Sequence, residues 1–177
     1  MSYRVRAVAF PLALLAGACG SPPPTSPPPP PVVACQLLLS EDVEQATGQR
    51  LYSMSSLAED ELGKDLTKCT YGTPPGDLVR VVALEVRAFG SLEQARDAQH
   101  SARRALKRMT AGDLEDVAGL ADGALWAGGQ VRQLHVLAGR RRLLVTVQVG
   151  DEKWLKERAI TLAGRILERL EKVDAGA

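Results

Sequence analysis

Three cysteines carry the most versatile side-chain chemistry in this chain of 177 residues: Cys19, Cys35 and Cys69. Cys19 ends an N-terminal apolar segment, which leaves Cys35 and Cys69 as an even pair 34 positions apart. A metal site needs more ligands at closer spacing, and a redox dithiol needs Cys-x-x-Cys. We therefore predict a structural disulfide, worth about 3–4 kcal/mol in the chain-entropy model. A metal pair or a redox pair is the alternative.

The other candidate catalytic side chains form no known motif. His100 falls in a predicted helix and His135 in a predicted strand, and neither has a ligand partner three or four residues later. Serine-nucleophile motifs are also missing from the sequence. The acidic groups of predicted loops lack the spacing of a calcium loop; they are Glu59, Asp60, Glu61, Glu115 and Asp116. We expect no enzyme activity, metal or cofactor; an enzyme would need His100 or His135 beside a carboxylate in a cleft.

The N-terminus has the pattern of a secretory signal peptide. Arg4 and Arg6 precede an apolar run over residues 7–15, and small residues lead to Cys19. The run is too short to span a membrane. A cysteine at the exit resembles the lipobox of bacterial lipoproteins, which implies a signal peptide over residues 1–18 and acylation of Cys19. The alternative is ordinary cleavage elsewhere, with Cys19 left as a free thiol.

A proline-rich segment follows Cys19. Residues 20–31 contain eight prolines together with Gly, Ser and Thr, a composition that favours extended polyproline II. At about 3.1 Å per residue, its ten-residue proline tract makes a spacer of roughly 30 Å. We interpret residues 19–33 as an acylated cysteine and a tether; a ligand for a proline-recognition domain is the alternative. Gly20 is not Asp, so the usual sorting rule places the protein in the outer membrane if the cell has two.

Composition limits the possible partners. Removing residues 1–18 takes away two arginines and no acids, which leaves 20 basic and 21 acidic residues. This balance argues against nucleic acid. Apolar residues make up 45% of the chain and aromatic residues 4%, so Leu, Val and Ala must build the core. The length suits one domain, over residues 34–173.

Hydrophobic periodicity places helices and strands along this domain. Ser40 predicts the N-cap of a helix over 41–47 that ends at Gly48, and Ser91 with Gln94 predicts the start of a helix to 109. A last helix covers 152–171. Predicted strands are 49–53, 68–71, 78–88 with a possible bulge, 124–126, and an antiparallel hairpin of 131–138 and 142–149. Residues 55–65 are a loop or weak helical turn, and 72–77 and 128–129 are turns.

Two predicted helices have an inward stripe. The stripe of the middle helix consists of Leu92, Ala95, Ala98, Ala102, Ala105, Leu106 and Met109. That of the last helix consists of Trp154, Leu155, Ala159, Leu162, Ala163, Ile166, Leu167 and Leu170. The basic residues Arg96, Arg103, Arg104, Lys107 and Arg108 lie around the other side of the middle helix. We interpret them as a solvated face; contact with anionic lipid or a partner is the alternative.

Three short motifs raise a further resemblance. They are Cys35-Gln-Leu-Leu leading to Gly48, Lys68-Cys-Thr-Tyr71, and Val117-Ala-Gly-Leu-Ala-Asp-Gly-Ala124. Together, over residues 34–170, they resemble small secreted bacterial lipoproteins of a domain-of-unknown-function family, with Ala121 at the place of a family glycine. The resemblance implies a disulfide-bearing, loosely PsbP-like fold: α+β, with an antiparallel sheet and helices packed on it. It implies no catalytic residues.

The expected function is that of a lipid-anchored extracytoplasmic lipoprotein that binds a partner or supports the envelope without catalysis. Its expected partners are the membrane, through Cys19, and an envelope protein or a small apolar ligand. The alternative is a small-ligand carrier with an apolar pocket between sheet and helices, near Trp126 and Tyr71.

Overall fold

The computed structural model describes residues 29–57, 65–74, 80–110 and 113–176. The predicted signal peptide, Cys19, most of the tether, Glu59, Asp60, Glu61 and the end of the predicted turn at 72–77 lie outside these residues. In chain order the elements are α1 (Ala34–Leu37), α2 (Ser40–Thr47), β1 (Tyr52–Leu57), β2 (Leu66–Gly72), β3 (Val81–Ala88), α4 (Leu92–Met109), β4 (Leu114–Val117), β5 (Gly123–Ala127), β6 (Gln133–Ala138), β7 (Arg141–Val147), the 3-10 helix η1 (Glu152–Trp154) and α5 (Leu155–Ala175).

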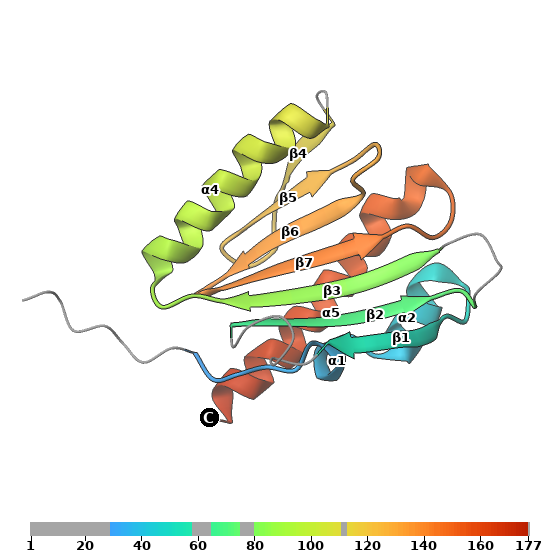
Figure 1. The fold of residues 1–177 in the computed structure, drawn as a ribbon, viewed down its shortest axis with the longest axis horizontal. Helices are drawn as coiled ribbons and strands as arrows, with labels where there is room; N and C mark the ends of the chain where they lie inside the picture. The colour runs from blue at the N-terminus through green and yellow to red at the C-terminus, as the bar shows by residue number, and fades with distance from the viewer. Residues whose placement is uncertain (1–28, 58–64, 75–79, 111–112, 177) are drawn as a thin grey trace, which may run out of the picture.

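The predicted fold class is confirmed: the domain is α+β. Its seven strands form one antiparallel sheet in the order β1-β2-β3-β7-β6-β5-β4 (Figure 1). The hairpin at Gly139-Arg140 places β6 beside β7, as the alternation of apolar residues predicts. Because β3 pairs with β7 at the centre, the sheet joins an N-terminal half to a C-terminal half.

Helices cover both faces of the sheet. The main core lies on the face of α1, α2 and α5, where the inward stripe of α5 meets alternate residues of the central strands, among them Leu84, Leu143 and Val145. On the opposite face, α4 contacts β6 and β7, and a smaller cluster of Leu106, Leu125 and Ala127 joins it to β5. Burial of both faces explains why three successive residues of β3, Val82 to Leu84, are buried.

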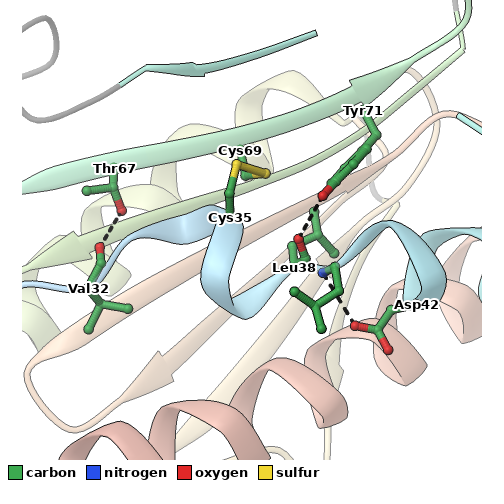
Figure 2. The surroundings of a disulfide bond; sticks show 8 residues. Val32, Cys35, Leu38, Asp42, Thr67, Cys69 and Tyr71 are labelled. Atoms are coloured by element: carbon green, nitrogen blue, oxygen red, sulfur yellow. Dashed lines mark hydrogen bonds between the residues drawn. A yellow bond between two sulfur atoms is a disulfide. The ribbon is translucent and has the colours of Figure 1, made fainter. Parts of the chain in front are cut away.

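The disulfide between Cys35 and Cys69 is present and joins α1 to β2, with 5.0 Å between the two Cα atoms. Two hydrogen bonds flank it (Figure 2): Thr67 Oγ1 donates to the Val32 carbonyl at 2.8 Å, and the Tyr71 hydroxyl donates to the Leu38 carbonyl at 3.2 Å. Disulfides of this kind are typical of oxidising, extracytoplasmic compartments. The disulfide therefore links α1, at the start of the domain, covalently to the sheet.

The N-cap predicted for the first helix is wrong by one residue. Ser40 is the first residue of α2, and the helix is preceded by Leu39, whose N–H donates to the Asp42 carboxylate at 3.4 Å. Gly48 ends α2 at φ 68°, in the left-handed region, as predicted. Asp42, three residues after Leu39, accepts this N–H and also binds two arginines of α5.

Three strand predictions need correction. The first strand begins at Tyr52 rather than at residue 49, and Ser55–Leu57 belong to β1 instead of a loop. The irregularity expected in β3 is wrong, because the register of β3 is continuous with both neighbours; the shift occurs in β1, between Ser53 and Ser55. The edge strand β4 has no counterpart among the predictions, since Leu114-Glu-Asp-Val117 becomes a strand only by pairing with β5.

The predicted helix stripes are correct at their centres and wrong at their ends. Ala95 and Leu106 of α4 are buried, but Leu92 and Met109, its first and last residues, are exposed. Trp154, predicted to face inward, is 51% exposed in η1 and lies beside the Lys153 ammonium. The 3-10 turn rotates Trp154 out of line with the buried face of α5, which starts only at Leu155.

The turn before β5 holds Ala121 in a conformation that favours glycine. Ala121 has φ 43°, and the turn closes through Gly123 N–H to the Leu120 carbonyl at 3.2 Å. The left-handed conformation costs an L-residue about 1–2 kcal/mol of strain in the folded state. Glycine avoids this strain, and its main cost is the greater conformational entropy of the unfolded chain. We predict that Ala121→Gly raises the free energy of unfolding by about 0.5 kcal/mol in urea titrations. Ala118→Gly, in the same connection but without a positive φ, should lower it instead; equal effects of the two changes would contradict the argument.

Candidate functional site

The candidate site is a cleft of about 430 Å³ between α4 and the sheet, which we call the α4–β5 cleft. One wall is the face of α4 that carries Arg96, Gln99, His100 and Arg103. The other wall and the floor come from the end of β4, the turn before β5, and β5 and β6; they are lined by Asp116, Val117, Ala118, Asp122, Gly123, Ala124, Leu125 and Leu137. The cleft volume is within the range of small-molecule sites.

Helical spacing brings the four side chains of the α4 wall together. Positions 96, 99, 100 and 103 follow one another at intervals of three and four residues, so they share one face of the helix. The Ser91 hydroxyl caps this helix by accepting the Gln94 N–H at 3.1 Å, as predicted from the sequence. Arg96 and Arg103 were expected on a solvated face, but both line the cleft while remaining exposed.

Carboxylates face these cations from the sheet side. The Arg103 guanidinium forms an ion pair with Asp116 of β4, which links the helix to the edge strand. Asp122 accepts the Gly139 N–H through Oδ2, so the turn before β5 is tied to the β6–β7 turn. Arg96 has no acidic partner in the described part of the chain. The cleft therefore carries positive groups on its helix wall and negative groups on its turn wall.

A buried polar cluster lies under α4, next to the cleft. His135 in β6 is 6% exposed, and neither of its ring nitrogens has a hydrogen-bond partner among the described residues. The Gln99 amide reaches the His135 carbonyl at 3.5 Å, but its Oε1 is buried without a partner, as is Nε of Arg142. Burial, with the nearby Arg142 charge, lowers the pKa of His135 to about 4. His135 is therefore neutral at pH 7 and closed off from solvent.

A second cleft, of about 460 Å³, lies where the chain enters the domain. It is bordered by Pro29 and Pro30, by the β6–β7 turn and by the end of α5. The buried Arg141 guanidinium donates to both Asp174 oxygens at 2.8 and 2.7 Å and to the Pro30 carbonyl at 2.9 Å. Both clefts are lined by Asp122, so they open at the same end of the sheet.

A charged network around Asp42 has a structural role. The buried Asp42 carboxylate accepts hydrogen bonds from the Arg165 guanidinium, at 3.0 Å, and from the Arg169 guanidinium. Arg169 also donates to the Leu37 carbonyl at 2.8 Å. This network fixes α1 and α2 on α5. Burial opposes ionisation of Asp42, but the two arginines and the Leu39 N–H together outweigh it and hold its pKa below the usual value.

We predict that Asp42→Asn lowers the free energy of unfolding by about 2 kcal/mol at pH 7, because charge-assisted hydrogen bonds to two arginines are lost. A carboxyl with a lowered pKa stabilises the fold above its unfolded pKa, near 3.9, and loses that effect as the pH falls through its folded pKa. The difference between wild type and variant should therefore shrink below pH 4. Urea unfolding at several pH values measures it, with the exposed Asp97→Asn as the control.

The structure separates most of the residues singled out in the sequence. Cys35 and Cys69 are bonded. His100 lies exposed on the cleft wall, whereas His135 is buried below it. Tyr71 in β2 and Trp126 in β5 are both buried in the main core, with three strands between them, so they do not line a common pocket. Glu115 forms an ion pair with Lys156 and contacts neither histidine in any hydrogen bond or ion pair of the described chain.

Sequence reasoning did not single out Gln99, Asp122 and Arg141, which line the two clefts. The spacing of Arg96, Gln99, His100 and Arg103 was a signal for one polar helix face, but nothing local shows that this face meets the turn at Asp122. Arg141 gave no signal, because its partners Pro30 and Asp174 are 111 and 33 residues away in the chain.

No family model, curated protein or solved structure matches the chain. The described residues hold no cluster of three or more metal-ligating His, Cys, Asp or Glu side chains. Within the same described ranges, the helices are all too short or too polar to cross a bilayer.

Proposed function

We propose that this protein is a lipid-anchored lipoprotein of the bacterial envelope that binds a ligand or partner outside the cytoplasm and catalyses no reaction. Its anchor is Cys19, its tether is the proline-rich segment, and its binding site is the α4–β5 cleft. The disulfide-bearing α+β domain with a seven-stranded antiparallel sheet also supports a relation to the small secreted lipoproteins whose motifs the sequence resembles.

The observation that carries this proposal is the way in which the chain enters the domain. Arg141 binds the Pro30 carbonyl and the Asp174 carboxylate, so the last prolines of the tether are fixed against the end of α5. Pro29 is ten positions after Cys19, and ten positions in polyproline II would reach roughly 31 Å. A domain held in this way turns its tether-side end, where both clefts open, toward the membrane.

Two features support a binding role over catalysis. The His135 ring is buried, so it cannot reach a substrate. His100 is exposed in the cleft, but the carboxylates there have structural partners: Asp116 pairs with Arg103, and Asp122 holds the Gly139 N–H. A general base of His100 would need a carboxylate to orient it, and no hydrogen bond or ion pair of the described chain joins His100 to Asp116 or Asp122. The mixed charges of the cleft fit recognition of a polar ligand.

Intact mass spectrometry of the membrane-extracted protein, before and after reduction and alkylation, tests the anchor. We expect a mass for the chain from Cys19 onward plus acyl chains, with two thiols alkylated only after reduction. Cys19→Ser should release the protein from the membrane fraction, whereas Arg141→Met should leave it there. An unacylated mass from the membrane-extracted protein would overturn the proposed anchor.

A further inference from the structure

We propose that the α4–β5 cleft binds a zwitterionic headgroup in which a primary ammonium is joined to a phosphate, as in glycerophosphoethanolamine. This inference rests on the proposed binding function and assigns the ligand of that site. It follows from two groups on opposite walls of the cleft that lack partners in the described chain, the Arg96 guanidinium and Oδ1 of Asp122.

The helix wall supplies the site for the phosphate. Arg96, in the second turn of α4, has no acidic partner among the described residues. Arg103, two turns further along, is neutralised by Asp116. A guanidinium binds phosphate oxygens through paired N–H donors. Arg96 is therefore the side chain of this wall that would stabilise a bound anionic group most.

The opposite wall supplies an acceptor for the ammonium. Asp122 uses Oδ2 for the Gly139 N–H, which leaves Oδ1 without a hydrogen bond in the described chain. Asp122 is exposed and lines the cleft, so a ligand can reach this oxygen. A primary ammonium has three N–H donors and a positive charge that complements the Asp122 carboxylate.

The floor and the location of the cleft complete the argument. Ala124, Leu125 and Leu137 form an apolar floor that can contact the methylene and glycerol carbons of the headgroup. The cleft shares Asp122 with the cleft bordered by Pro29 and Pro30, so it lies at the end of the domain from which the tether leaves. That end faces the lipid surface in the proposed arrangement, where zwitterionic headgroups are abundant.

Titration calorimetry with the full chain carrying Cys19→Ser tests the inference. Glycerophosphoethanolamine should bind at least tenfold more tightly than glycerol 3-phosphate or ethanolamine, and more tightly than glycerophosphocholine, whose quaternary ammonium has no N–H donor. Arg96→Met and Asp122→Asn should each weaken binding at least tenfold. Asp122→Asn keeps an acceptor for the Gly139 N–H, so the turn is preserved. Arg108→Met, exposed on α4 outside the cleft, is the matched control and should bind like the parent.

Several results would overturn the inference. Equal affinity for glycerol 3-phosphate would make the cleft a simple anion site, and unchanged binding in Arg96→Met and Asp122→Asn would place the ligand elsewhere. Absence of binding at millimolar ligand would also refute it. Flotation with phosphatidylethanolamine vesicles, against phosphatidylcholine vesicles, separates the two sources: capture assigns the membrane lipid, and binding of the soluble headgroup alone assigns a free ligand. Because the tested protein carries no acyl chain, failure of the anchor and failure of the cleft are distinguishable.

Discussion

Replacing both Cys35 and Cys69 with Ala will lower the free energy of unfolding by about 3–4 kcal/mol, the value for a closed loop of 34 residues in the chain-entropy model. The loss is large because the bond restricts the unfolded chain and also holds α1 on β2. The free energy of unfolding of a typical domain is only about 5–15 kcal/mol. Equilibrium urea unfolding in a Cys19→Ser background, where no third thiol can exchange, measures the change.

A comparison of the oxidised and the reduced parent protein is the matched control, because the two differ in no side chain other than the thiols. Both reduction and double substitution should also increase the m value, the slope of the unfolding free energy against urea concentration. The unfolded chain without the disulfide exposes more surface. A double variant as stable as the oxidised protein would show that the Thr67–Val32 and Tyr71–Leu38 hydrogen bonds hold α1 in place without the bond.

The protein will lose about 2 kcal/mol of stability between pH 7 and pH 5, and about 3 kcal/mol by pH 4, through His135 alone. Burial, assisted by the Arg142 charge, lowers the pKa of His135 in the folded protein to about 4, against about 6.5 in the unfolded chain. Between these values the unfolded state binds more protons than the folded state. The stabilisation is therefore complete above pH 6.5 and is lost as the pH falls toward 4.

His135→Leu should remove this pH dependence, because leucine fills a similar space and cannot take up a proton. It should also make the protein more stable than wild type at pH 5, since it removes two buried ring nitrogens that have no partner in the described chain. His100→Leu is the control, because His100 is exposed and its loss should leave the pH dependence of the unfolding free energy unchanged. Thermal or urea unfolding between pH 4 and pH 7 measures this dependence. A slope that persists in His135→Leu would mean that another group titrates.

Local sequence patterns were sufficient for much of the fold. The alternation from Leu143 to Val149 and the stripe from Leu155 to Leu170 each repeat with the period of one element, so they predict a strand and a helix without knowledge of their partners. Ser91, Gly48 and the Gly139-Arg140 turn act within a few residues of themselves. The pairing of Cys35 with Cys69 needed only the count and spacing of the cysteines.

The tertiary structure decided the features that depend on distant partners. Leu114-Glu-Asp-Val117 is a strand because β5 provides its hydrogen bonds, and Trp154 is exposed because η1 rotates it away from α5. Arg96 and Asp122, 26 positions apart, face one cleft because α4 crosses the sheet above the turn before β5. The sequence by itself determined most of the elements, because their periodicity is local, but not the edge strand β4. The cleft, the buried His135 and the contact of Arg141 with Pro30 arise only when separate elements pack together, since no local pattern encodes which faces meet.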